Sequence, residues 1–61
     1  MKVKEMIKLI EDNGWFQVRQ RGSHRQFNHH IKRGTVTVAG KPNDDLAKGT
    51  EKSILRQAEL K

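Results

Sequence analysis

In this 61-residue chain, the residues most able to carry out catalysis lie in the segment RQRGSHRQF, from Arg19 to Phe27. It places one histidine among three arginines. An imidazole takes up and releases protons near neutral pH, and guanidinium groups stabilise the negative charge that develops on a phosphate. These groups suffice to cleave RNA, because the RNA 2′-hydroxyl itself attacks the neighbouring phosphorus. We expect His24 to act as general base or acid and Arg19, Arg21 and Arg25 to hold phosphate.

The sequence holds fewer of the residues that metal-ion catalysis or a serine nucleophile would need. His29 and His30 are adjacent, so on a strand their side chains point apart. Asp44 and Asp45 come without the further oxygen ligands that a hard cation requires. Ser23 lies beside a histidine, but no acidic residue is near in sequence to orient that base. We therefore expect neither a metal, nor another cofactor, nor a serine nucleophile.

The net charge of +6 is concentrated in the middle of the chain. No Asp or Glu occurs between Asn13 and Asn43, whereas the two flanks carry seven basic and seven acidic residues, which cancel. An unopposed cationic segment favours a polyanionic partner, which is nucleic acid, an anionic membrane or an acidic protein. Charge that serves only solubility usually mixes both signs. The basic residues of the middle segment are Arg19, Arg21, Arg25, Lys32, Arg33 and Lys41.

Hydrophobic periodicity predicts the elements that position these residues. Val3, Met6, Ile7 and Ile10 follow the spacing of an amphipathic helix, which Asn13-Gly14 ends. Alternating and β-branched segments separated by short turns then predict a meander of three antiparallel strands. After a loop over 40–49, Thr50 is expected to cap a second helix. The expected elements are a helix over 2–13, strands over 15–20, 24–29 and 35–39, and a helix from 50.

The order α-β-β-β-α predicts an α+β domain, in which two helices cover one face of a three-stranded antiparallel sheet and the other face stays open. If Phe27 packs under the helices, Arg25 and His29 share its side. His24 then lies on the open face, accessible beside the turn. Trp15 and Phe16 follow the first helix and are expected to be core residues rather than surfaces for base stacking.

Size and composition set further bounds. A chain of 61 residues forms one domain with a small core and marginal stability. The absence of cysteine fits a reducing compartment. No apolar run approaches the roughly 20 residues of a membrane span, and no signal peptide is evident. We expect a cytoplasmic protein that does not enter the membrane.

Three segments together resemble the HicA-type toxins of bacterial toxin–antitoxin pairs, also called YcfA-like proteins. They are Gly14-Trp15-Phe16 leading into RQRGSHRQF, the strand TVTV, and the closing DLAKGTEKSILRQA. The resemblance covers nearly the whole chain, so that residues 1–61 are identified as a single toxin domain. It implies a fold similar to that of double-stranded-RNA-binding domains.

The resemblance also implies an activity and partners. Such toxins are metal-independent endoribonucleases that cleave mRNA, and a HicB-type antitoxin binds and masks them. The catalytic histidine of the family's Gly-Ser-His motif corresponds to His24, and Gly22 is the glycine that permits the turn. The predicted RNA-binding residues are Arg19, Arg21, Ser23, Arg25, Lys48 and Lys52.

Two other functions stay open at this point. A non-catalytic RNA-binding module of similar fold would hold duplex RNA by its shape and phosphates without cleaving it. A scaffold for an acidic protein partner would use the same basic surface but show no salt-dependent RNA binding. Lys48, Lys52 and Arg56 are spaced by four residues, so on a helix they form one basic stripe, which suits either an RNA backbone or plain solvent exposure.

Overall fold

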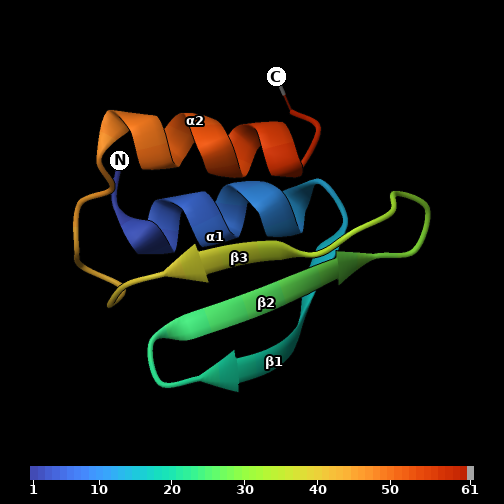
Figure 1. Cartoon of the computed structure of the whole chain (residues 1–61), viewed down its shortest axis with the longest axis horizontal. Helices are drawn as coiled ribbons and strands as arrows, with labels where there is room; N and C mark the ends of the chain where they lie inside the picture. Colours follow the sequence, from blue (N-terminus) through green and yellow to red (C-terminus); the bar gives the residue numbers. More distant parts are fainter. Residues whose placement is uncertain (61) are drawn as a thin grey trace.

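The computed structural model describes residues 1–60, so that Lys61, the last residue of the expected domain, lies outside the described part. The three strands pair antiparallel in the order β1-β2-β3 (Figure 1). This confirms the predicted α+β class and the order α-β-β-β-α. The elements are α1 (Val3–Asp12), β1 (Trp15–Arg21), β2 (His24–His29), β3 (Val36–Ala39) and α2 (Lys48–Gln57).

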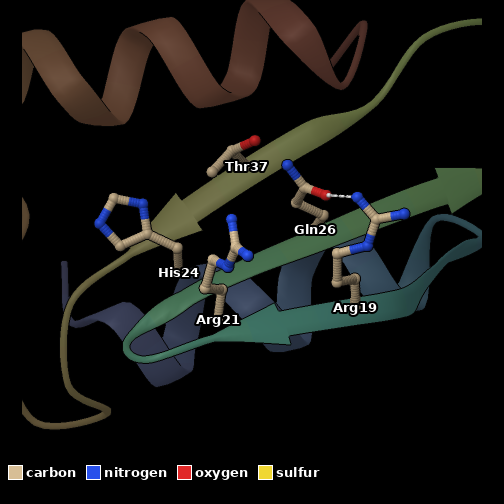
Figure 2. Close-up of a pocket in the computed structure, with 5 residues that line it drawn as sticks. All are labelled: Arg19, Arg21, His24, Gln26 and Thr37. Carbon is tan, nitrogen blue, oxygen red and sulfur yellow. Dashed lines mark hydrogen bonds between the residues drawn. The ribbon is translucent and has the colours of Figure 1, made fainter.

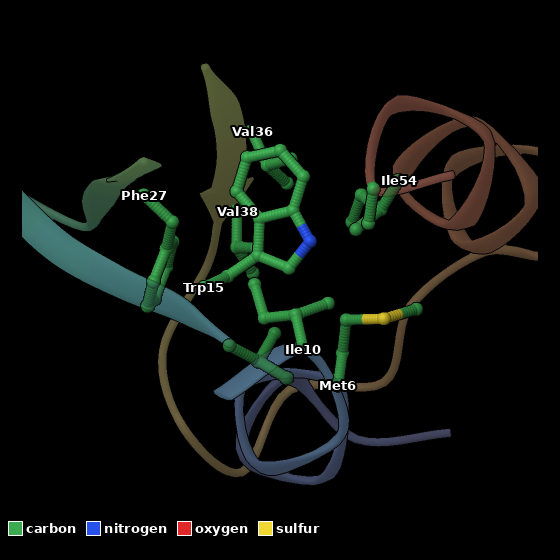
Figure 3. Close-up of a cluster of buried hydrophobic side chains, with 9 residues drawn as sticks. Met6, Ile10, Trp15, Phe27, Val36, Val38 and Ile54 are labelled. Atoms are coloured by element: carbon green, nitrogen blue, oxygen red, sulfur yellow. The ribbon is translucent and has the colours of Figure 1, made fainter. Parts of the chain in front are cut away.

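The core lies between the two helices and one face of the sheet (Figure 3). Every element contributes to it, and where an element buries several residues they follow the period of its secondary structure. On β3, for example, the buried valines alternate with Thr37, while α1 buries residues three and four positions apart. The buried residues are Val3, Met6, Ile10, Trp15, Phe27, Val36, Val38, Ile54 and Ala58.

The second helix begins two residues earlier than predicted. Ala47 is the N-cap and has an extended backbone, and the Glu51 N–H donates to the Ala47 carbonyl at 2.9 Å. Thr50 therefore lies inside the first turn, and its prediction as the cap was wrong. Leu46 packs against the core just before this point, so tertiary packing brings the chain into the helix here although Ala47 has no capping side chain.

The loop over 40–47 is held by more than the packing of Leu46. The N–H groups of Val3 and Lys4 donate to the carbonyls of Asp44 (2.9 Å) and Pro42 (3.0 Å). These are N–H groups of the first turn of α1, which have no partner within their own helix. The loop thus provides hydrogen-bond acceptors for the first turn of α1. This long-range contact cannot be predicted from the residue types of the loop.

Strand β1 contains an irregularity that changes which way its side chains face. Phe16 pairs with Asn28 and Gln17 with Phe27, but the next paired residue is Arg19, opposite Gln26. Val18 is thus the extra residue of a β-bulge. The bulge puts Arg19 and Arg21 on the same face as Phe16.

Trp15 is buried, as predicted. Phe16, the next residue, points to the opposite, open face by the alternation of the strand and is 37% exposed, so its prediction as a core residue was wrong.

Candidate functional site

The open face of the sheet carries a pocket of about 350 Å³ at the end where β1 turns into β2 (Figure 2). All three strands supply side chains to it, and none comes from a helix. The lining combines two cations, an imidazole, an amide and a hydroxyl. The lining residues are Arg19, Arg21, His24, Gln26 and Thr37.

Strand pairing brings these residues together from distant parts of the sequence. Arg21 lies opposite His24, Arg19 opposite Gln26, and Gln26 opposite Thr37 on its other side. Directly paired residues of antiparallel strands project from the same face with Cβ atoms about 5 Å apart. The pocket therefore consists of two neighbouring cross-strand rows on the open face.

The turn between β1 and β2 depends on Gly22, whose φ is +60°. Gly22 and Ser23 form a two-residue loop with a positive φ at its first position only, which is the sign pattern of a type II′ turn. A Cβ on Gly22 would meet no atom within 4 Å, so the glycine is required by the backbone conformation and not by lack of space. The tight turn fixes the register that pairs Arg21 with His24.

The pocket is cationic, and few hydrogen bonds hold its charged side chains in place. Arg19 Nη1 donates to Gln26 Oε1 at 3.4 Å, which leaves most of its N–H groups free for a ligand. Within residues 1–60, neither Arg19 nor Arg21 forms a salt bridge, and no carboxylate lines the pocket. His24 is exposed, and no hydrogen bond to another described residue holds its ring. The site can therefore offer both positive charge and a free imidazole to an incoming anion.

The other predicted RNA-binding residues lie outside this pocket. Arg25 faces the opposite side of β2, is half-buried, and donates from Nη1 to the Gly40 carbonyl at 3.3 Å. Ser23 lies in the turn, where its carbonyl accepts from the Gly40 N–H. Lys48 and Lys52 are exposed on α2. The structure thus assembles Arg19, Arg21 and His24, and leaves the remaining four apart from them.

The surroundings of His29 differ from those of His24. His29 Nδ1 accepts from the N–H groups of Ile31 (3.0 Å) and Lys32 (3.1 Å), so the proton of the neutral ring is on Nε2, which donates to the Asn13 carbonyl at 3.0 Å. This ring also meets Trp15 edge-on, with centroids 5.2 Å apart. His29 therefore ties the loop after β2 to the end of α1.

Gln26 and Thr37 were not among the predicted site residues. The signal for them is alternation: Gln26 is two residues from His24 on the same strand, and Thr37 alternates with the buried Val36 and Val38. Alternation gives the face, but only the register of β2 against β3 shows that these two side chains meet.

Two surveys cover the described part of the chain. Among residues 1–60, no group of three or more His, Cys, Asp or Glu side chains is arranged to hold a metal ion. Over the same residues, no helix is long and apolar enough to cross a membrane.

Comparison with known proteins identifies the class of protein to which this chain belongs. A solved chain from a "Toxin-Antitoxin complex from Streptococcus pneumoniae" superposes with a TM-score of 0.80 and 36% sequence identity, and the match covers 98% of each chain. No curated protein matches the sequence. The family model described as the HicA toxin of bacterial toxin-antitoxin matches residues 3–60. The chain therefore belongs to the HicA toxin family and is a toxin of the toxin–antitoxin type.

Proposed function

We propose that this toxin is an endoribonuclease that cleaves mRNA in the Arg19–Arg21–His24 pocket without a metal ion, and that residues 1–61 act as one toxin domain. One observation carries the proposal. A free imidazole lies opposite Arg21 and lines one pocket with Arg21 and Arg19, which have no acidic partner in residues 1–60, on an open sheet face.

The proposed reaction needs only the groups that the pocket provides. His24 takes the proton of the RNA 2′-hydroxyl as its oxygen bonds to the adjacent phosphorus. The guanidinium groups of Arg19 and Arg21 stabilise the negative charge on the phosphoryl oxygens. The bond from phosphorus to the 5′-oxygen then breaks, and this oxygen takes a proton from solvent, to which the pocket is open. The products are a 2′,3′-cyclic phosphate and a 5′-hydroxyl.

A protein antitoxin is the second proposed partner. The family consists of toxins of toxin–antitoxin pairs, and the similar solved chain comes from a toxin–antitoxin complex. We propose a HicB-type antitoxin that masks this toxin, and we propose that both proteins act in the cytoplasm.

Cleavage of RNA by the purified protein tests the proposed function. We expect cleavage that persists in EDTA, stops when the 2′-hydroxyl at the cleaved position is replaced by hydrogen, and falls at least 100-fold in His24→Ala. Lys4→Ala, which removes an exposed cation from α1, is the matched control and should cleave like wild type. Binding without cleavage in the wild type would instead favour the RNA-binding module.

A further inference from the structure

An aromatic pair lies on the same sheet face as the pocket, at the opposite end of β1 and β2. The Phe16 and His30 rings have centroids 4.6 Å apart and planes inclined by 33°. Phe16 is 37% exposed and His30 is exposed, and neither belongs to the core. Because both rings lie on the surface, their contact contributes little to the packing of the core.

The position of this pair relative to the pocket follows from the strand register. Phe16 lies opposite Asn28, and Asn28 is four residues from His24 on the regular strand β2. Even-numbered spacing puts Phe16, Asn28 and His24 on one face, about 14 Å apart along the strand at ~3.4 Å per residue. The aromatic pair and the pocket are therefore the two ends of one continuous surface.

A polar pair borders the aromatic rings. The Thr35 hydroxyl donates to Asn28 Oδ1 at 3.1 Å, and within residues 1–60 no hydrogen bond uses the Asn28 amide nitrogen. Its N–H groups are therefore available to an acceptor on the edge of a planar ligand. Together the four side chains offer what a nucleobase needs: a ring to stack on and a donor beside it.

We propose that Phe16 and His30, with Asn28 beside them, form a stacking site for an unpaired base of the RNA whose backbone lies across Arg19 and Arg21. The inference rests on the proposed function and narrows its substrate class to single-stranded RNA. A duplex buries its base faces in its own stack, whereas single strands are held by aromatic side chains beside a cationic groove. Charge supports this occupant, because no acidic residue occurs between Asn13 and Asn43.

The test measures RNA affinity by fluorescence anisotropy in the His24→Ala background, which separates binding from cleavage. Three probes of equal length are compared: a single-stranded RNA, the same backbone without bases, and an RNA duplex. Phe16→Ala should weaken binding of the single strand by about 5- to 100-fold and leave the other two probes within about twofold. Phe16→Trp should retain the affinity.

Two controls separate stacking from folding and from general apolar contact. Ile31, 86% exposed and next to His30, is the matched control, and Ile31→Ala should leave all three affinities unchanged. Phe16→Leu keeps the apolar bulk and should still lose the base-dependent part, while circular dichroism confirms that each variant is folded.

The outcomes distinguish this inference from the proposed function. Equal losses on all three probes, or none, would overturn the stacking site even if wild type cleaves RNA. A base-dependent loss in Phe16→Ala together with wild type that does not cleave would keep the stacking site and overturn the nuclease. If none of the three probes binds, both fall.

Discussion

His24 begins β2 and His29 ends it, and the odd separation puts their rings on opposite faces of the sheet. His29 is held at both nitrogens, by two N–H donors and by a carbonyl acceptor, and its ring touches Trp15. His24 has no such partner within residues 1–60. An imidazole with both nitrogens hydrogen-bonded within the protein has a structural role. One with both nitrogens free can exchange protons with a ligand.

A glycine accompanies each histidine, and the two glycines differ in the same way. A Cβ on Gly14 would lie 2.6 Å from His29 Nε2, so this position needs both a positive φ and empty space. Gly22, beside His24, needs only the positive φ. The fixed ring thus lies directly against its neighbouring glycine, whereas a Cβ on the glycine beside the free ring would contact nothing among the described residues.

The largest expected effect comes from removing the free ring. His24→Ala should lower the cleavage rate constant by about 10²- to 10⁴-fold, the usual contribution of general acid–base catalysis. Its melting temperature should stay close to that of wild type, because an exposed, unpartnered side chain is lost. Single-turnover cleavage and thermal melts of the same samples measure both quantities. A variant that cleaves normally would remove the contrast with His29.

The second largest effect distinguishes an arginine on the open face of the sheet from one on the helix-covered face. Arg21→Ala should slow cleavage by about 10²-fold, the cost of removing one donor to the developing charge. Arg25→Ala, a matched loss of one guanidinium from the helix-covered face, should change the rate by less than about threefold. The comparison is made at several salt concentrations, and equal losses in both variants would show that charge alone, and not position, matters.

Removing the fixed ring should cost stability rather than catalysis. His29→Ala should lower the free energy of unfolding by about 2 kcal/mol, since two backbone N–H groups lose their acceptor at about 1 kcal/mol each. For a domain of this size the melting temperature then falls by about 10 °C. Urea unfolding measures the loss, and the rate of cleavage per folded molecule should stay near the wild-type value. A large fall in that rate would give His29 a role in catalysis.

The smallest contrast lies between the two glycines. Gly14→Ala should destabilise the protein by about 2 kcal/mol, because a left-handed backbone conformation and a steric conflict with His29 add together. Gly22→Ala should cost about 1 kcal/mol, from the backbone conformation alone. Equilibrium unfolding of the two variants under one set of conditions gives the difference, and equal values would show that the His29 ring simply moves aside.

The sequence predicts the order of elements well, because the buried residues of α1 and β3 follow helical and strand periods closely. It also predicts that His24 is accessible and that Arg25 lies on the other face, since β2 is regular. It does not predict that Arg19 and Arg21 share the open face with Phe16, because the bulge at Val18 that puts them there depends on pairing with β2. Nor does it place Thr37 in the pocket, since that contact depends on the register between β2 and β3.

The extra residue at Val18 has a consequence for how the strand tolerates length changes. Side chains along β1 behave like a two-letter reading frame, and the bulge shifts that frame once between Phe16 and Arg19. An uncompensated insertion or deletion of one residue between the bulge and the turn would turn either the aromatic end or the cationic end of the strand away from the open face. Composition, net charge and even the motif around His24 could all survive such a change. The two halves of the surface would nevertheless no longer face the same molecule.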